Sequence, residues 1–285
     1  MRLVSYDTGD GPVAGVLVED RIVSASSLDA PAVDVRGLLT ALDADGLRRL
    51  GERAADAAAG ESVALADARL HAPVLDPQKI IGVGLNYRDH AEETGQEIPK
   101  APMWFAKFAN SLIGAGEEIV LPSAHPNRVD YEAELALVVG RKARNVGEGE
   151  ALSYLAGAMP FNDVSARDLQ MQNPLWTSGK AIDTFAPCGP ALVTLDQIDD
   201  LQALTLRTRI DGETVQEGTS ANLIFGPAEL VSWLSRTLTL LPGDVIATGT
   251  PAGVGASRRS YLQDGQTVTV EIDGLGALVN RVRAE

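Results

Sequence analysis

The sequence predicts an α+β fold in which a small N-terminal domain precedes a larger, β-rich main domain. Beyond Lys79 the chain consists of short runs of Val, Ile and Leu separated by Gly and Pro, a pattern that is typical of strands joined by turns. Helical spacing of apolar residues is concentrated instead in residues 27–70. The stretch HAPVLDPQK, with two prolines, lies between these regions and is the best candidate for a linker. We therefore divide the chain into residues 1–72 and residues 73–285.

Two kinds of element are expected in the N-terminal domain. Residues 1–25 alternate between apolar and polar positions around Gly9-Asp10-Gly11, which predicts a small hairpin sheet. The following segment VRGLLTALDADGLRRLGERAADAAAG is rich in Ala, Asp and Arg and predicts one or two amphipathic helices. Nothing in this domain forms a motif that indicates a function.

The main domain is expected to be a sheet-rich unit with two helices. Strands are predicted at the runs IIGVGL, EEIVLP, EAELALVVG, CGPALVT, LTLRTRIDG, DVIATGT and TVTVEIDG. Helices are predicted near residues 88–95 and 228–240. No period of 20–50 residues recurs in the sequence, which argues against a repeat protein.

Composition excludes several classes of partner. No apolar run approaches the ~20 residues that a membrane span requires, and the polar N-terminus MRLVSYDTGD has no apolar signal region, so we expect a soluble protein. The single cysteine, Cys188, rules out an internal disulfide and fits a reducing cytoplasm. A formal net charge of -15 repels nucleic acid and anionic membranes. An anionic substrate therefore needs local cations, either a metal ion or placed Lys and Arg side chains.

Several common catalytic motifs are absent. The segment IGVGLNY has Tyr87 where a dinucleotide-binding loop needs its third glycine, SGKAI lacks the rest of a P-loop, and no Gly-x-Ser-x-Gly elbow occurs. Cys188 has no motif around it and is expected to serve packing. Three histidines in the whole chain argue against a poly-histidine zinc site.

The segment DYEAELALVVG contains the strongest signal for a metal site. Strand periodicity places Glu132 and Glu134 on one face, and both faces become apolar further along the strand. Two adjacent buried carboxylates are costly unless a cation lies between them. All-oxygen ligands favour a hard ion, namely Mg²⁺, Mn²⁺ or Ca²⁺. The alternative is an exposed strand end with paired surface acids, and spacing leaves both open.

A third acidic residue, Asp163, follows another apolar run in MPFNDVSARDLQ. It is a candidate ligand for the same ion. It is equally a candidate to cap the following helical turn, because Ser165 and Asp168 have the spacing of a capping box. Periodicity does not choose between these roles.

A candidate general base lies in LNYRDHAEETG. His90 and Glu93 are three residues apart, hence on one face of a helix, whereas Glu92 points elsewhere. A carboxylate beside an imidazole fixes its tautomer and raises its basicity. The alternative is an exposed histidine with an incidental acidic neighbour. The polar continuation ETGQEIPK predicts that this helix lies on a movable flap.

Taken together, these segments resemble the fumarylacetoacetate hydrolase family. The matching blocks occur in order over residues 79–282: GLNYRDHAEE, PMWFAKFANSLIG, VDYEAELALVVG, FNDVSARDLQ, WTSGKAIDTFAPCGP and PGDVIATGTPAGVG. The resemblance implies a mixed β-sandwich roll, a homodimer and a bound Mg²⁺ or Mn²⁺ ion. It makes Glu132, Glu134 and Asp163 the metal ligands, and it makes His90 and Glu93 the dyad that activates water.

The resemblance also implies substrate contacts and a set of reactions. Gln170 and Lys180 would face the substrate or its developing negative charge, Thr250 would contact a carboxylate or ketone, and Lys107 is a further candidate contact. Members hydrolyse acylpyruvates or other 2,4-dioxo acids, decarboxylate oxaloacetate, or isomerise hydroxymuconate-type dienes. We expect carbon–carbon bond hydrolysis of a 2,4-dioxo acid, as in the bacterial catabolic branch that cleaves diketo acids. A metal-binding protein without turnover would need neither the His90–Glu93 pair nor Lys180.

Overall fold

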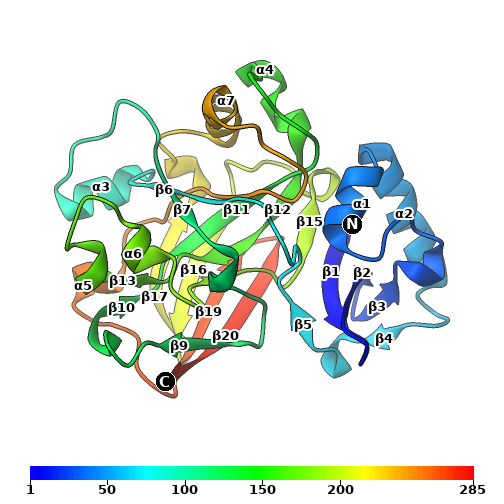
Figure 1. The fold of residues 1–285 in the computed structure, drawn as a ribbon, viewed down its shortest axis with the longest axis horizontal. Coiled ribbons are helices and arrows are strands. Elements are labelled where there is room, and N and C mark those ends of the chain that lie inside the picture. Colours follow the sequence, from blue (N-terminus) through cyan, green and yellow to red (C-terminus); the bar gives the residue numbers. More distant parts are fainter.

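The computed structural model describes residues 1–285, except for the side chain of Pro126. Its N-terminal part is a small antiparallel sheet with two helices beside it (Figure 1). The elements are β1 (Arg2–Asp7), β2 (Pro12–Val18), β3 (Arg21–Ser24), α1 (Val35–Ala41), α2 (Ala44–Ala57), β4 (Val63–Ala64) and β5 (Leu70–His71). Asp34 and Asp43 begin the two helices, since each carboxylate accepts a hydrogen bond from a backbone N–H of the first turn. The predicted hairpin and helices are confirmed, with two short strands added after α2.

The largest sheet runs through both parts of the chain. Its strand order is β4-β3-β2-β1-β15-β12-β11-β18-β6-β7, and β5 pairs with β1. The strands contributed by the main part are β6 (Ile80–Gly84), β7 (Met103–Lys107), β11 (Ala133–Val139), β12 (Leu155–Asn162), β15 (Leu192–Thr194) and β18 (Val245–Ala247). Arg2 and Leu3 of β1 pair with Val193 and Leu192 of β15, so the N-terminal strands extend the main sheet. A domain boundary at residue 72 stays a prediction.

A second, five-stranded sheet packs against the centre of the first. Its order is β17 (Glu213–Thr219), β16 (Thr205–Ile210), β19 (Thr267–Ile272), β20 (Gly276–Ala284) and β9 (Glu118–Leu121). Leu135 and Leu137 of β11 share a buried cluster with Leu206 of β16 and Ile272 of β19. The central strand β11 is consequently buried along its whole length. This confirms the interior strand that the sequence predicted.

Two small strand pairs and six α-helices among the described residues complete the main part. Two small strand pairs are β10 (Val129–Asp130) with β13 (Ser165–Ala166), and β8 (Leu112–Ile113) with β14 (Ala186–Pro187). The helices are α3 (Arg88–Thr94), α4 (Glu148–Ala151), α5 (Arg167–Gln170), α6 (Thr177–Lys180), α7 (Pro227–Thr237) and α8 (Gly255–Arg258). The two predicted helices correspond to α3 and α7, and α3, α5 and α6 lie on the same side of the molecule in Figure 1.

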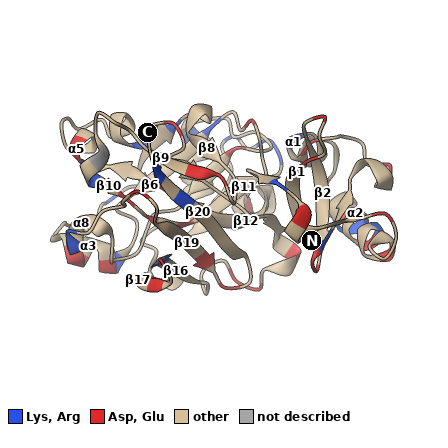
Figure 2. Ribbon diagram, turned by 90° about the horizontal axis from the view of Figure 1, so that it is seen from below, with Lys and Arg blue, Asp and Glu red and all other residues tan. Residues whose placement is uncertain are grey.

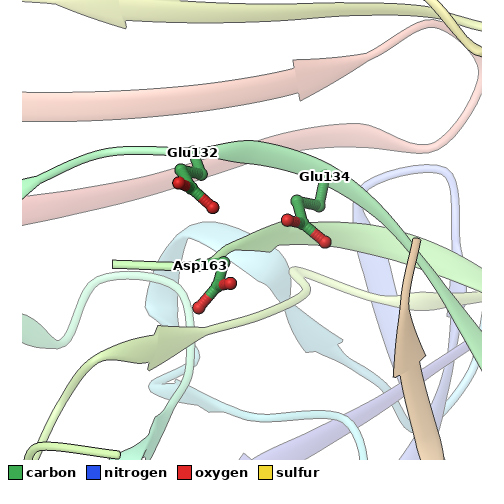
Figure 3. A group of neighbouring side chains, drawn as sticks. All are labelled: Glu132, Glu134 and Asp163. Carbon is green, nitrogen blue, oxygen red and sulfur yellow. The ribbon is translucent and has the colours of Figure 1, made fainter. Parts of the chain in front are cut away.

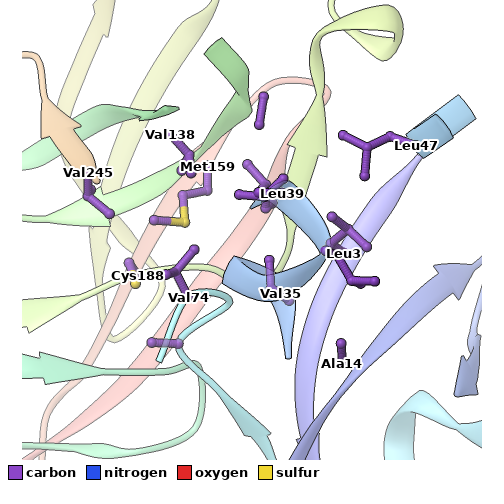
Figure 4. Packing of buried hydrophobic residues seen from close by; sticks show 14 of the residues in the cluster. Leu3, Ala14, Val35, Leu39, Leu47, Val74, Val138, Met159, Cys188 and Val245 are labelled. Atoms are coloured by element: carbon purple, nitrogen blue, oxygen red, sulfur yellow. The ribbon is translucent and has the colours of Figure 1, made fainter. Parts of the chain in front are cut away.

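One apolar core joins the N-terminal helices to the main sheet. Leu39 of α1 and Leu3 of β1 belong to the same buried cluster as Val138 and Met159 of the main sheet (Figure 4). Cys188 lies in this cluster, fully buried, and burial raises the pKa of its thiol. Its packing role therefore agrees with the prediction from sequence.

Replacing Leu39 with alanine is expected to destabilise the fold by about 2–5 kcal/mol, the usual cost of a cavity at a buried leucine. Leu39 is only 2% exposed, so water does not readily fill the cavity that the smaller alanine side chain leaves. Urea unfolding followed by circular dichroism measures the change. Val33→Ala is the control, because Val33 is 64% exposed. This variant should have the same urea midpoint as the parent. A Leu39→Ala midpoint equal to the parent midpoint would contradict this packing.

Two features of the described residues are the hydropathy of their helices and the distribution of their charges. None of their helices is long and apolar enough to span a bilayer. Acidic and basic positions are interspersed over both parts of the chain (Figure 2). The net charge of -15 is therefore spread over the molecule, and local cations have to provide any affinity for an anion.

Candidate active site

The three predicted acidic ligands converge at one end of the central strands (Figure 3). Glu134 is the second residue of β11, Glu132 directly precedes that strand, and Asp163 directly follows β12. Because Ala133 pairs with Asn162, these two strand ends are neighbours. One carboxylate oxygen of each residue lies within 4.8 Å of the others, and all three side chains are buried. The alternative of an exposed strand end is therefore excluded.

Three cations, two of them buried lysines, surround two of these carboxylates. Lys180 Nζ donates to Glu132 Oε2 at 2.8 Å and to Asp163 Oδ2 at 2.7 Å. Lys107 Nζ donates to Asp163 Oδ1 at 2.6 Å. Arg167 Nη2 lies 2.7 Å from Glu132 Oε1. Both oxygens of Glu132 and of Asp163 thus have a cationic neighbour.

Glu134 has a different environment from its two neighbours. Among the described residues it forms no salt bridge, and its Oε2 accepts a hydrogen bond from the Gly249 N–H at 2.8 Å. Burial, with the nearby negative charges of Asp163 and Glu132, raises the pKa of Glu134 well above its usual value. Burial acts in the same direction on Glu132, but Lys180 and Arg167 overcome it and lower the pKa of Glu132 to about 2. The site therefore contains one carboxyl group whose charged form is costly without a further cation.

These residues fit a divalent cation. The donor set is three carboxylates, which suits a hard ion such as Mg²⁺ or Mn²⁺. Each carboxylate oxygen has two lone pairs, so the oxygens that already accept from lysine or arginine retain capacity for an ion. A cation would also compensate the charge of Glu134, with which no side chain among the described residues forms a direct ion pair. The assignment of the three ligands stays a prediction.

The capping role considered for Asp163 is wrong. Its carboxylate contacts Lys107 and Lys180, and α5 begins after Ala166 with no side-chain cap. Asp168 accepts from the Leu169 N–H and lies 3.0 Å from His125 Nδ1, so no capping box forms. The two lysines attract the Asp163 carboxylate more strongly than the orphan N–H groups of a four-residue helix.

The position of α3 is set by the residues that precede it. Asn86 is fully buried, and its side-chain amide hydrogen-bonds to the backbone of Phe225 and Thr248. Leu85 has a φ of 50°, in the left-handed region that a residue with a side chain seldom adopts. These hydrogen bonds hold the strained turn from β6 into α3.

His90 and Glu93 form the predicted contact on α3. His90 Nδ1 lies 3.3 Å from Glu93 Oε2, and Glu93 Oε1 accepts a hydrogen bond from the Gly253 N–H at 2.9 Å. Since a carboxylate only accepts, this contact puts the imidazole proton on Nδ1 and leaves Nε2 free as a base. Whether α3 moves as a flap stays a prediction.

Two glycines allow the loop after β18 to reach both parts of the site. Gly249 and Gly253 have φ angles of 104° and 102°, which favour glycine. A Cβ on Gly249 would lie 2.9 Å from Asn86 Cβ, and one on Gly253 would lie 2.7 Å from the Val215 carbonyl oxygen. Their N–H groups donate to Glu134 and Glu93 respectively.

A cavity of about 400 Å³ connects the carboxylates with His90. His90, Gln170, Lys180 and Thr250 line it together with the three acidic residues. Gln170 Oε1 accepts from Arg167, which leaves its amide N–H groups for a ligand, and Thr250 Oγ1 accepts from Gln216, which leaves its hydroxyl proton. Lys107 is not among the lining residues and touches the site through Asp163. Its direct contact with substrate stays a prediction.

The structure also brings in residues that the sequence did not single out. Arg167 joins Glu132 to Asp130, and Arg128 lines the cavity. Phe105 and Trp176 form an edge-to-face pair on the wall, with ring centroids 5.7 Å apart. For Arg167 the available signal was its place between Asp163 and Gln170. Phe105 and Trp176 stand within segments noted in the sequence, and Arg128 directly precedes another, but no spacing in those segments indicates that these side chains reach the site.

Comparison with known proteins agrees with this architecture. Residues 79–283 match the family described as Fumarylacetoacetate (FAA) hydrolase C-terminal. Over 215 residues the chain is 44% identical to the Homo sapiens protein named oxaloacetate tautomerase FAHD2A, mitochondrial, covering 74% of this chain and 68% of that protein. Proteins of this family are enzymes, and they include hydrolases, isomerases and tautomerases.

Solved structures share the fold over the whole chain. The 5-carboxymethyl-2-hydroxymuconate delta-isomerase of Mycobacterium smegmatis is similar with a TM-score of 0.78 and 35% identity, covering 100% of this chain and 99% of that one. The maleylpyruvate hydrolase of Sphingobium sp. SYK-6, in complex with manganese (II) ion and pyruvate, has a TM-score of 0.83 and 28% identity, with coverages of 100% and 99%. These likenesses confirm the predicted α+β, sheet-rich fold. The chain belongs to the fumarylacetoacetate hydrolase family.

Proposed function

We propose that this enzyme hydrolyses a carbon–carbon bond in a 2,4-dioxo acid of the acylpyruvate type, releasing a carboxylic acid and pyruvate or a related 2-oxo acid. One observation carries the proposal: His90, which is paired with Glu93, lines the same cavity as three buried carboxylates. The pair provides a base for water, and the carboxylates provide a metal site for a 2-oxo acid.

The ion we propose is Mg²⁺ or Mn²⁺, held by Glu132, Glu134 and Asp163. When bound, such an ion attracts the carboxylate and 2-oxo oxygens of the substrate and draws electron density from the carbon skeleton. The manganese and pyruvate in the Sphingobium hydrolase structure support this choice. A bound ion would also supply affinity for an anion, which the net charge of -15 opposes.

His90 would act as the general base. Its Nδ1 is held by Glu93, so Nε2 is the nitrogen that takes a proton from water. The water oxygen then bonds to the 4-oxo carbon of the substrate. Glu93 stabilises the resulting imidazolium through its carboxylate, and Gly253 fixes that carboxylate in place.

Cleavage follows when the bond between C3 and C4 breaks. C4 leaves as the carboxylic acid, and the electron pair of the broken bond forms the enolate of the 2-oxo acid. Lys180, buried and cationic, stabilises the enolate oxygen, while Gln170 and Thr250 have free hydrogen-bond donors for the remaining oxygens. Return of the proton from His90 to C3 gives the 2-oxo acid and restores the base.

The reaction class can be tested by comparing two substrates. Acetylpyruvate and oxaloacetate are incubated with the enzyme, with and without Mg²⁺, and pyruvate is measured. We expect metal-dependent pyruvate release from acetylpyruvate at a rate exceeding that from oxaloacetate. Release of pyruvate from oxaloacetate but not from acetylpyruvate would favour decarboxylation and would overturn the hydrolase proposal.

A second candidate is favoured by the 44% identity to the human oxaloacetate tautomerase. Tautomerisation moves a proton between C3 and the 2-oxo oxygen, and His90 could carry it without an attacking water. Enol-to-keto conversion of oxaloacetate is followed by ultraviolet absorbance. Rapid, enzyme-dependent conversion without acetylpyruvate cleavage would assign the tautomerase activity. The related isomerase alternative is proton transfer within a hydroxymuconate-type diene.

We also propose that the enzyme is a cytoplasmic homodimer. The prediction of a dimer is tested by light scattering at micromolar concentration, where a mass twice the 30.0 kDa of one chain is expected. A mass of 30.0 kDa would show that the prediction of a dimer is wrong. The cytoplasmic location is supported by the single buried cysteine, which forms no disulfide.

A further inference from the structure

One buried amide behind the cavity wall has every hydrogen-bonding position in use. Gln216 of β17 is only 1% exposed and is not among the residues that line the cavity. Its Oε1 accepts from the Ala133 N–H at 3.1 Å and from the Thr208 hydroxyl at 2.7 Å. Its Nε2 donates to Thr250 Oγ1 at 3.0 Å and to the Pro251 carbonyl oxygen at 3.1 Å. A carboxamide offers two donors and two lone pairs, so this side chain is fully satisfied.

The partners of Gln216 allow one orientation of its amide. The Ala133 N–H can only donate, so it requires the amide oxygen, and the Pro251 carbonyl oxygen can only accept, so it requires the amide nitrogen. Thr250 Oγ1 therefore receives a hydrogen bond and cannot return its own proton to Gln216. No other described residue accepts from the Thr250 hydroxyl, and Thr250 lines the cavity. The hydroxyl proton is consequently available to a ligand in the cavity.

The hydrogen bonds run in one direction from the second sheet to the cavity. Thr208 donates to Gln216, Gln216 donates to Thr250, and Thr250 has a proton left for a ligand. Donation to the amide oxygen polarises the amide and makes its N–H a stronger donor. The same holds at the Thr250 hydroxyl, so the chain of hydrogen bonds favours a negatively charged acceptor at its end.

Local backbone features place Gln216 at this point. Gln216 and Thr214 pair with successive residues of β16, so Val215 between them is an extra residue that forms a β-bulge. Bulges often redirect a side chain beside a functional site. The loop after β18 lies close against the bulge, because a Cβ on Gly253 would lie 2.7 Å from the Val215 carbonyl oxygen and 3.1 Å from Gln216 Cγ. The bulge and the glycine thus bring the amide within reach of the loop that contains Thr250.

The same amide connects the Thr250 hydroxyl to the carboxylates of the site. Ala133, whose N–H donates to Gln216, lies between Glu132 and Glu134 in the chain. One side chain therefore holds both the strand that presents the proposed metal ligands and the loop that presents Thr250.

We propose that Gln216 is a positioning residue that makes Thr250 a fixed hydrogen-bond donor to an oxygen of the bound 2-oxo acid. Gln216 does not touch the ligand and acts through Thr250. This inference rests on the proposed function for the class of ligand. It implies that the direction of the hydrogen bond between the two side chains, rather than their packing, determines how much Thr250 contributes to affinity.

A double-mutant cycle with pyruvate as the ligand tests the proposal. Gln216→Glu keeps the size of the side chain and replaces the donor that faces Thr250 with an acceptor, so the Thr250 hydroxyl turns to it. Thr250→Val keeps the shape and removes the hydroxyl. Calorimetric titration of pyruvate at saturating Mn²⁺ should show about ten-fold weaker binding in Thr250→Val, the contribution of a hydrogen bond to a charged group. Gln216→Glu should weaken binding of pyruvate by at least as much.

The decisive quantity is the effect of Gln216→Glu in the Thr250→Val background. It should be smaller by about ten-fold than in the parent, because no hydroxyl is left to turn away from the ligand. The added negative charge repels pyruvate in both backgrounds and cancels in the cycle.

A neutral variant covers the case in which Gln216→Glu does not fold. Gln216→Met removes the donor without adding charge and leaves the Thr250 hydroxyl free to rotate. A free hydroxyl has three staggered positions, so binding of pyruvate should weaken by about three-fold, and only when Thr250 is present.

Two controls separate the direction of the hydrogen bond from packing. Thr250→Ser keeps the hydroxyl and should bind pyruvate like the parent. Asn280→Leu is the matched control for loss of a buried amide. Asn280 is 2% exposed and donates to the backbone oxygens of Gly114 and Glu117, but it is not among the residues that line the cavity. Its loss should leave the affinity for pyruvate unchanged.

The positioning role and the proposed function can fail separately. Equal effects of the Gln216 variants with and without the Thr250 hydroxyl, or no binding of pyruvate by the parent, would overturn the positioning role. If the cycle shows the coupling but the parent cleaves no acylpyruvate, the hydrolase proposal is wrong and the positioning role stands. If the parent cleaves acylpyruvate and the cycle shows no coupling, the hydrolase proposal stands and the positioning role is wrong.

Discussion

Replacement of Glu134 with alanine is expected to abolish metal-dependent turnover. Glu134 is the one carboxylate of the three without a cationic side-chain partner among the described residues, so its charge is the one most available to a metal ion. Loss of a direct ligand should weaken Mn²⁺ binding by more than the roughly 10- to 100-fold that loss of a supporting residue costs. Calorimetric titration of Mn²⁺ measures the affinity, and pyruvate release measures turnover.

Two further variants serve as comparisons for Glu134→Ala. Glu134→Gln keeps the shape and removes the charge, and it should behave like Glu134→Ala if the carboxylate binds the ion. Glu150→Ala removes an exposed acid of α4, outside the cavity, and should bind Mn²⁺ like the parent. Unchanged Mn²⁺ affinity in Glu134→Ala would show that the ligand assignment is wrong.

Replacement of His90 with alanine is expected to lower acylpyruvate hydrolysis by about 10²–10⁴-fold, the usual contribution of a positioned general base. Mn²⁺ binding should change little, because His90 pairs with Glu93 and the ion is assigned to three other residues. Glu93→Gln should fall between the parent and His90→Ala, since the imidazole remains but loses the carboxylate that orients it. Single-turnover kinetics on acetylpyruvate measures the effect.

A second reaction and a second variant separate the roles of base and cation. Decarboxylation of oxaloacetate needs no attacking water, so it should suffer less than hydrolysis in His90→Ala. Lys180→Ala should damage both reactions, because both place negative charge on the same enolate oxygen. A His90→Ala enzyme that hydrolyses acylpyruvates at the parent rate would make His90 an ordinary histidine.

Local patterns in the sequence predicted much of the fold and the centre of the site. The alternation in DYEAELALVVG predicted an interior strand, and β11 is buried throughout. The i,i+3 spacing predicted the contact between His90 and Glu93. The Gly253 N–H holds the Glu93 carboxylate in place by donating a hydrogen bond to it. These features depend on neighbours in the chain, so periodicity is sufficient to find them.

Features that depend on long-range pairing could not be predicted. The joining of β1 to β15 brings together residues nearly 200 positions apart, and no pattern within either strand specifies its partner. Asp163 illustrates the same difficulty in the site. Its spacing to Ser165 and Asp168 suited a helix cap, but two lysines from distant segments determine where its carboxylate points. Arg128 lines the cavity beside residues of α8, a helix far along the chain that Asp130 of β10 holds by accepting hydrogen bonds from Gly255 and Ala256.

The central claim is that a metal ion and a general base together cleave the bond between C3 and C4 of a 2,4-dioxo acid. The most direct measurement is the stoichiometry of products from acetylpyruvate in the presence of Mn²⁺, quantified by nuclear magnetic resonance. We expect one acetate and one pyruvate for each acetylpyruvate consumed, and no products above background after removal of the metal with a chelator. Consumption of acetylpyruvate without acetate, or equal rates with and without the metal, would contradict the claim.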